Sequence, residues 1–179
     1  MSKLMRLLRH LWLDARDAER ALGKDGLDRI ERRITESERL HCGQICVCVE
    51  ASLPLRYLWR HLGRGEPIEA VIADRALTMF GKQRVWDTEH NNGVLIYVLL
   101  AEHEIDILAD RGLSKHVSTD DWLTTIEQAL AHLRDGRLED GLNAAIEEAH
   151  AVLAQHFPRE SADESIVPGK GLPNRPQIR

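Results

Sequence analysis

The chain has little cysteine, few aromatic side chains and no excess of positive charge. Its three cysteines, Cys42, Cys46 and Cys48, are odd in number and lie in one short segment, which excludes a disulfide framework. Zinc sites favour other spacings, such as paired Cys-x-x-Cys. The net charge of -5, together with the lack of a uniformly basic segment, argues against a nucleic-acid partner.

Long apolar runs are missing as well. No run approaches the roughly 18 residues that span a bilayer, and the first residues are too charged and too short for a secretory signal. We therefore expect a cytoplasmic protein. With 179 residues, of which 43% are hydrophobic and 30% charged, the chain is long enough for one ordinary core.

Composition divides the chain into three parts. Residues 1–22 form an N-terminal amphipathic helical segment, and residues 23–157 form an α/β domain. Residues 158–179 are rich in Pro, Gly, Ser and charge and show no periodicity, so we expect a disordered tail.

Residues 3–13 have the pattern of an amphipathic helix. Its basic arc carries Lys3, Arg6, Arg9 and His10. Its apolar arc consists of Leu4, Met5, Leu7, Leu8, Leu11 and Trp12. Two interpretations fit this pattern. Either the apolar arc docks on the domain, or the helix makes a peripheral contact with an anionic membrane.

Three segments have the length and pattern of strands. Residues 44–51 place Cys46 and Cys48 on one face, where both thiols act as small buried hydrophobes. Residues 93–101 are almost entirely apolar, and residues 104–110 alternate apolar with acidic side chains. Helical patterns occupy residues 27–41, 54–61, 67–80, from Ser118 to about 135, and 138–156. This order predicts an α/β three-layer sandwich, with a small mixed β-sheet flanked by helices.

Only Glu102 and His103 separate the second and third strands, which predicts an antiparallel hairpin. The helical crossover before the second strand makes it parallel to the first. The start of strands one and two and the end of strand three therefore meet at one edge of the sheet.

Polar side chains gather at this edge. We expect five of them to converge as ligands of calcium or magnesium, since these cations prefer carboxylate and amide oxygens. The five are Asp87, Glu89, Asn91, Asn92 and Asp110. Two further candidates, Glu38 and His41, precede the first strand at the same edge. The alternative is a solvated turn in which Asn92-Gly93 supplies a positive φ.

The segments GQICVCVEASL, ALTMFGK, NNGVLIYVLL, DILADRGL and DGRLEDGLNAAI follow one another in an order that resembles the TPM domain family. This family includes a thylakoid-lumen acid phosphatase-like protein and many bacterial proteins. The resemblance covers residues 27–153. It implies a three-layer α/β fold, a divalent-cation site in loops at one sheet edge, and weak phosphatase activity in some relatives. Many relatives are exported and carry a signal peptide or a transmembrane tail, and this chain shows neither.

Two classes of function remain open. The first is metal-dependent hydrolysis of a phosphomonoester, with Asp87, Asp110 and Arg111 as catalytic candidates and Lys115 and His116 facing the phosphate. The second is a non-catalytic module in which the cation orders the loops for a protein partner. Trp86 would be an anchor for such a partner. Peripheral membrane contact through residues 3–13 is a third alternative.

Overall fold

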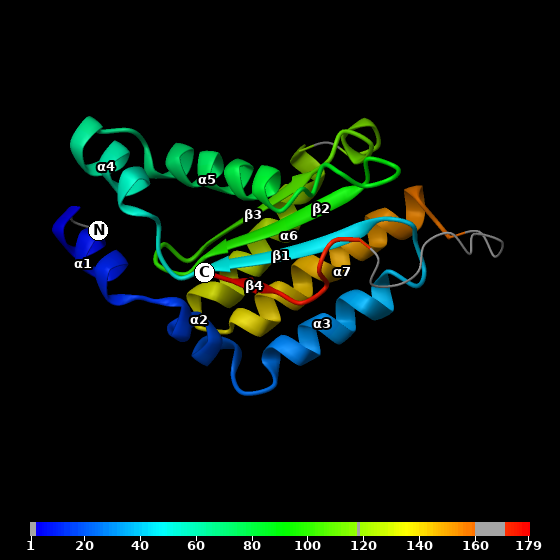
Figure 1. Ribbon diagram of the computed structural model, residues 1–179, viewed down its shortest axis with the longest axis horizontal. Coiled ribbons are helices and arrows are strands. Elements are labelled where there is room, and N and C mark those ends of the chain that lie inside the picture. The colour runs from blue at the N-terminus through cyan, green and yellow to red at the C-terminus, as the bar shows by residue number, and fades with distance from the viewer. Residues whose placement is uncertain (1–2, 118, 160–170) are drawn as a thin grey trace.

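A computed structural model describes residues 3–117, 119–159 and 171–179 (Figure 1). Ser118, where we expect a helix to open, lies outside these residues. The helices are α1 (Lys3–Trp12), α2 (Ala15–Leu22), α3 (Gly26–Ser37), α4 (Leu55–Arg64), α5 (Ile68–Lys82), α6 (Thr119–Arg134) and α7 (Leu138–His156), with a short 3-10 helix, η1 (Leu113–Lys115). The strands are β1 (Gln44–Glu50), β2 (Gly93–Leu99), β3 (Glu104–Ala109) and β4 (Gln177–Ile178).

The strands form one mixed sheet in the order β3-β2-β1-β4. β1 runs parallel to β2, with Ile45 opposite Val94, and β2 runs antiparallel to β3, with Val94 opposite Ala109. The parallel pair and the hairpin are both confirmed.

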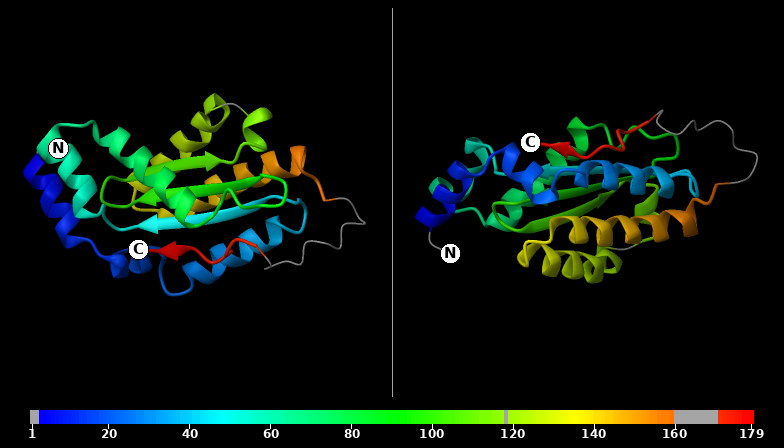
Figure 2. Two further views of the ribbon diagram at one scale, coloured as in Figure 1. Left: turned by 45° about the horizontal axis from the view of Figure 1, so that its top comes forward. Right: turned by 90° about the horizontal axis from the view of Figure 1, so that it is seen from below.

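Helices cover both faces of this sheet (Figures 1 and 2). Ile45, Val47 and Ile96 face a core built with α2, α3, α6 and α7. Leu95 and Tyr97 face a second core built with α4 and α5. The two cores arise because successive side chains of a strand point to opposite faces. The three-layer α/β sandwich is therefore confirmed.

Cys46 and Cys48 lie in the second core as free, fully buried thiols. Burial raises the pKa of each thiol to about 12, so both remain protonated at neutral pH. Cys46 Sγ lies 2.6 Å from Gln83 Oε1, to which it donates. The two side chains fill the core as predicted.

The expected boundary at residue 22 does not separate two packing units. Asp14 caps α2 by accepting from the backbone amides of Arg16 and Asp17. Ala18 and Leu22 are both buried in the first core. α2 is therefore part of the α/β domain, because its apolar stripe closes that core.

The expectation of a disordered tail is wrong for residues 171–179. β4 adds to the free edge of β1, where the amide of Arg179 donates to Val49 O over 3.0 Å. Leu172 is buried, and its amide donates to Gln44 Oε1 over 2.9 Å. A two-residue strand is too short to show periodicity, but its backbone hydrogen bonds cover part of the otherwise unpaired edge of β1. Residues 160–170 lie outside the described part.

α1 does dock on the domain, but mainly with its basic arc instead of its apolar arc. His10 is buried, whereas Leu4, Leu11 and Trp12 are exposed. Leu7 of the apolar arc packs against the second core. The interpretation in which this arc packs on the domain is wrong for its exposed members, since polar groups of the domain bind the basic side chains of the helix.

None of the described helices combines the length and the apolar character needed to cross a membrane.

Candidate functional site

The loop before β2 and the turn after β3 meet at one edge of the sheet. The amide of Asp110 donates to Gly93 O over 2.9 Å, which extends the β2–β3 pairing by one step. The amide of Gln44 donates to Asn92 O over 3.4 Å, which brings the start of β1 to the same edge. Strand pairing thus brings the buried part of the predicted site together.

Asn92 and Asp110 are buried at this edge, and each has side-chain polar atoms without a hydrogen-bond partner among the described residues. Asn92 is 1% exposed, and within the described structure neither Oδ1 nor Nδ2 has a partner. Asp110 is 7% exposed; its Oδ1 accepts from the Arg111 amide over 2.7 Å, whereas its Oδ2 has no partner there. Buried polar atoms are costly unless a ligand, water or side chain satisfies them. The unsatisfied atoms make this edge the candidate binding position.

The remaining predicted ligands lie in the outer loop and point elsewhere. Asp87 is exposed and forms an ion pair with Arg84. Glu89 is also exposed. Asn91 Oδ1 accepts from Nε and Nη2 of Arg111, over 3.0 and 2.8 Å, which ties the loop to the turn after β3. The predicted side chains thus share one edge without forming a single ligand shell.

The turn differs from the one predicted. The positive φ, 53°, belongs to Asn91 instead of Asn92-Gly93. Asparagine tolerates this left-handed conformation better than most residues. Gly93 is required for another reason: a Cβ at this position would overlap Val85 O. The amide of Asn92 donates to Thr88 Oγ1 over 2.9 Å and closes the loop.

Glu38 and His41 lie beside the start of β1 but are engaged there. Glu38 Oε1 accepts from the Ile45 amide over 3.1 Å, and burial raises the pKa of Glu38 to about 7. Burial, followed by the neighbouring His150, lowers the pKa of His41 to about 4. These partners explain both side chains without a metal ion.

A hydrogen-bonded cluster of Ser37, His41 and His150 was not predicted. His41 Nδ1 donates to Gly43 O over 3.1 Å, so its Nε2 accepts from Ser37 Oγ over 2.8 Å. His150 Nδ1 then donates to Ser37 Oγ over 2.9 Å. A base with a pKa near 4 is poorly matched to activating a serine at neutral pH. The cluster instead joins the end of α3 to α7.

His116 and Lys115, the residues predicted to face a phosphate, follow Arg111 in the chain. Both side chains are exposed on η1 and the turn after it. The ring of His116 stacks on His156 with centroids 4.8 Å apart and meets Phe157 edge-on. This places His116 against the end of α7.

A buried ionic network occupies the opposite end of β1 and was also not predicted. Arg75 and Glu50 form a two-pronged ion pair, with a distance of 2.8 Å between Arg75 Nε and Glu50 Oε2. Tyr97 Oη donates to the same Glu50 oxygen over 2.6 Å. Hydrogen bonding to Glu50 raises the pKa of Arg75, and burial raises the pKa of Tyr97. Sequence spacing gives no sign of this α5–sheet contact.

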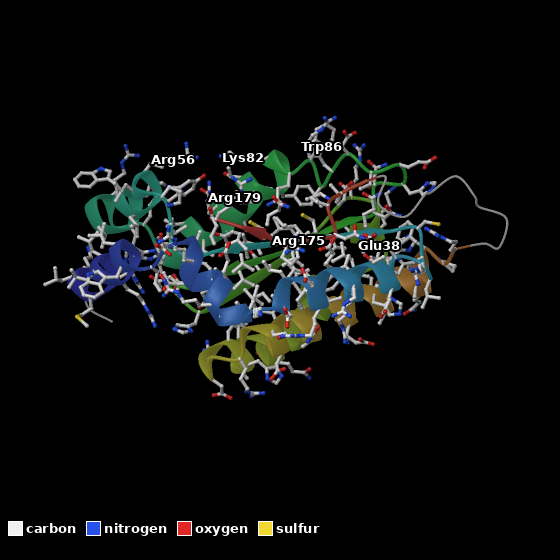
Figure 3. All side chains as sticks on the ribbon, turned by 60° about the horizontal axis from the view of Figure 1, so that its bottom comes forward. Glu38, Arg56, Lys82, Trp86, Arg175 and Arg179 are labelled. Carbon is white, nitrogen blue, oxygen red and sulfur yellow. The ribbon has the colours of Figure 1, made fainter. Side chains whose placement is uncertain are left out.

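Across the described residues, no three His, Cys, Asp or Glu side chains gather closely enough to hold a metal ion. The fit to a cation therefore depends on mixed carboxylate and amide oxygens, chiefly those of Asp110 and Asn92. Figure 3 shows Glu38 and Trp86 toward one end of the molecule and Arg56 toward the other.

Residues 15–152 match the TPM domain family, and the chain belongs to this family. The fold is similar to the NMR structure of the BA42 protein from the psychrophilic bacterium Bizionia argentinensis, with a TM-score of 0.67. The two chains are 27% identical, and the match covers 86% of this chain and 93% of BA42. No curated protein matches the chain.

Proposed function

We propose that this protein is a divalent-cation-binding TPM module whose site is built on Asp110 and Asn92. One observation carries the proposal: both side chains are buried at a loop-lined sheet edge with polar atoms that no described group satisfies. Calcium and magnesium take oxygen ligands of this kind and complete their shells with water.

The ligands come from the buried strand ends and from the exposed loop before β2. Asp110 Oδ1 is already held by the Arg111 amide, so Oδ2 is the ligand atom. Asn92 supplies an amide oxygen. Asp87 and Glu89 are exposed on the loop before β2. Together with water they complete the ligand shell, once Asp87 has released Arg84. Arg111 positions the loop through Asn91.

The ordered loops would then present a surface to a protein partner. Trp86 is 51% exposed next to this loop, and a half-exposed Trp is the kind of side chain that anchors interfaces. This supports a non-catalytic module in which the cation stabilises the partner-binding face.

Weak metal-dependent phosphatase activity is the second candidate. Arg111 is exposed beside Asp110, and a transferring phosphoryl group is stabilised by a metal ion and a guanidinium. If this activity exists, hydrolysis of a generic phosphomonoester should require the added cation. It should also disappear in both Arg111→Gln and Asp87→Ala.

The decisive experiment is calorimetric titration of chelator-stripped protein with calcium and then with magnesium. We expect saturable binding by the wild-type protein and its loss in Asp110→Asn, a nearly isosteric change. Asp140→Asn is the control, since this exposed carboxylate lies at the start of α7. At one hundred times the dissociation constant, binding adds about 2.7 kcal/mol to the free energy of unfolding. Wild-type protein without binding heat or a rise in Tm would refute the proposal.

A further inference from the structure

The basic arc of α1 is held against the domain by specific polar contacts. His10 accepts from the Leu53 amide at Nδ1 over 3.1 Å, and therefore donates from Nε2 to Glu102 over 3.0 Å. Arg6 pairs with the same carboxylate over 2.9 Å and donates to His61 Nε2 over 2.6 Å. These bonds determine which face of the helix points outward.

The outward face of α1 is the apolar one. Leu4, Leu8 and Leu11 are exposed, and Trp12 is 84% exposed. Exposing this many large apolar side chains on one helix face is unfavourable in water, and contiguous patches of this kind mark interaction surfaces. The arrangement is the reverse of an ordinary surface helix, whose apolar stripe faces the core.

α4 continues this surface. Leu55 is exposed, and Trp59 is 66% exposed. Both line an open, mainly apolar pocket of about 940 Å³, to which Leu7 of α1 also contributes. Figure 1 shows α1 and α4 side by side at one end of the molecule.

The charge of this surface differs from that of the whole protein. α1 and α4 contain no Asp or Glu, although the chain has a net charge of -5. Arg6 and Arg60 form ion pairs with carboxylates of the domain, whereas Lys3 of α1 is exposed. Arg56 and Arg64 are exposed on α4, beside the apolar pocket that they help to line. Figure 3 shows Arg56 projecting from α4 at this end.

We propose that α1 and α4 together form a docking surface for the anionic face of a lipid bilayer. Apolar side chains with interfacial Trp, flanked by Lys and Arg, are the features with which monotopic helices enter the headgroup region. A second copy fits less well, because a two-fold contact would bring two basic surfaces together. The inference does not depend on cation binding.

The orientation of the bound protein follows from the sheet. β2 begins at the Asn92 edge and ends in the turn that carries Glu102, where α1 docks. The strand ends that carry Asn92 and Asp110 therefore lie at the far end of the sheet, away from the bilayer. Membrane docking would leave that edge and Trp86 accessible.

Co-sedimentation of the full chain with vesicles tests the proposal. Vesicles of phosphatidylcholine are compared with vesicles that contain about 30% phosphatidylglycerol, at low salt and at about 0.5 M NaCl. We expect about tenfold stronger partitioning to the anionic vesicles, weakened by salt. Equal binding to both vesicles, or binding to neither, would overturn the proposal.

Paired variants distinguish binding through α1 from non-specific hydrophobic binding of the protein to vesicles. Leu4→Gln with Leu8→Gln should reduce binding to anionic vesicles about tenfold or more. The control pair is Leu40→Gln with Leu77→Gln, which changes two leucines elsewhere that are both more exposed than Leu8 and should leave binding unchanged. Equal effects of the two pairs would overturn the assignment.

A second pair of variants tests the charge. Arg56→Gln with Arg64→Gln should remove the preference for anionic lipid, whereas Lys24→Gln with Lys82→Gln should preserve it. Sedimentation velocity without lipid measures whether the protein associates with itself through this surface. Self-association that is lost in the leucine variants, with no vesicle binding, would show that the surface binds a second copy and would refute membrane docking.

Discussion

The Glu50–Arg75 ion pair provides a quantitative prediction about stability. Both side chains are almost fully buried, and Tyr97 Oη donates to the carboxylate. Arg75→Met removes the cation and leaves a buried carboxylate with only the Tyr97 hydrogen bond. Breaking a buried ion pair from one side typically costs about 3–5 kcal/mol, because the remaining charge is uncompensated.

This loss is large compared with the free energy of unfolding of a domain, which is about 5–15 kcal/mol. For a chain of this size, 1 kcal/mol shifts Tm by about 2–4 °C. We therefore expect Arg75→Met to lower Tm by about 10 °C, measured by circular dichroism. Arg33→Met, which breaks the exposed pair with Glu147, should cost less than about 1 kcal/mol.

A double-mutant cycle with Glu50→Gln tests the cause. Glu50→Gln alone leaves a buried guanidinium, whereas Glu50→Gln with Arg75→Met leaves no buried charge. The double variant should therefore be about 2–3 kcal/mol more stable than the sum of the single effects predicts. Strictly additive effects would show that the single losses come from packing, and would refute the electrostatic argument.

Three further predictions concern the strand ends near Glu38 and Asn92 and the outer edge of β1. As pH rises from 4.5 to 7, Glu38→Gln should gain about 3 kcal/mol relative to wild type, because the folded wild-type protein keeps the Glu38 proton that the unfolded chain has already lost. As pH rises from 4 to 6.5, His41→Gln should lose a similar amount relative to wild type, because His41 is neutral in the folded wild-type protein and still protonated in the unfolded chain. Urea titrations across this range measure both slopes, and parallel curves for the three proteins would contradict the assigned shifts. Gly93→Ala should lower the free energy of unfolding in urea titration by about 3 kcal/mol, because its Cβ would overlap Val85 O. The control, Gly81→Ala in α5, where a Cβ meets nothing, should be neutral or stabilising. Similar free energies of unfolding for the two variants would contradict the clash. Deleting residues 171–179 should lower Tm and raise light scattering, since it removes β4 from the edge of β1, and unchanged behaviour would show that β4 does not protect that edge.

Much of the fold was predictable because it depends on local patterns. The apolar run before Leu99 predicts a strand buried on both faces, and the short connection at Glu102 predicts a hairpin. The crossover through α5 makes β1 and β2 parallel. These rules also bring Asn92 and Asp110 to one edge. They do not say which side chains turn inward, and Asp87 and Glu89 stay in solvent.

The missed features all join residues that are distant in sequence. Glu50 meets Arg75 between β1 and α5, and Ser37 meets His150 between α3 and α7. Hydrogen bonds of this kind require atoms to be placed within a few tenths of an ångström. Periodicity reports only which face of an element is apolar, so it contains no information about such pairs.

The sequence alone determined the TPM family, the strand faces and the sheet edge that carries the candidate cation ligands. It also determined that α1 has one basic and one apolar face. Only the tertiary structure decided which of these faces is buried, because Glu102 and His61 bind the basic side chains of α1 from other parts of the chain. The same holds for β4, whose two residues become a strand only because the edge of β1 offers them backbone partners.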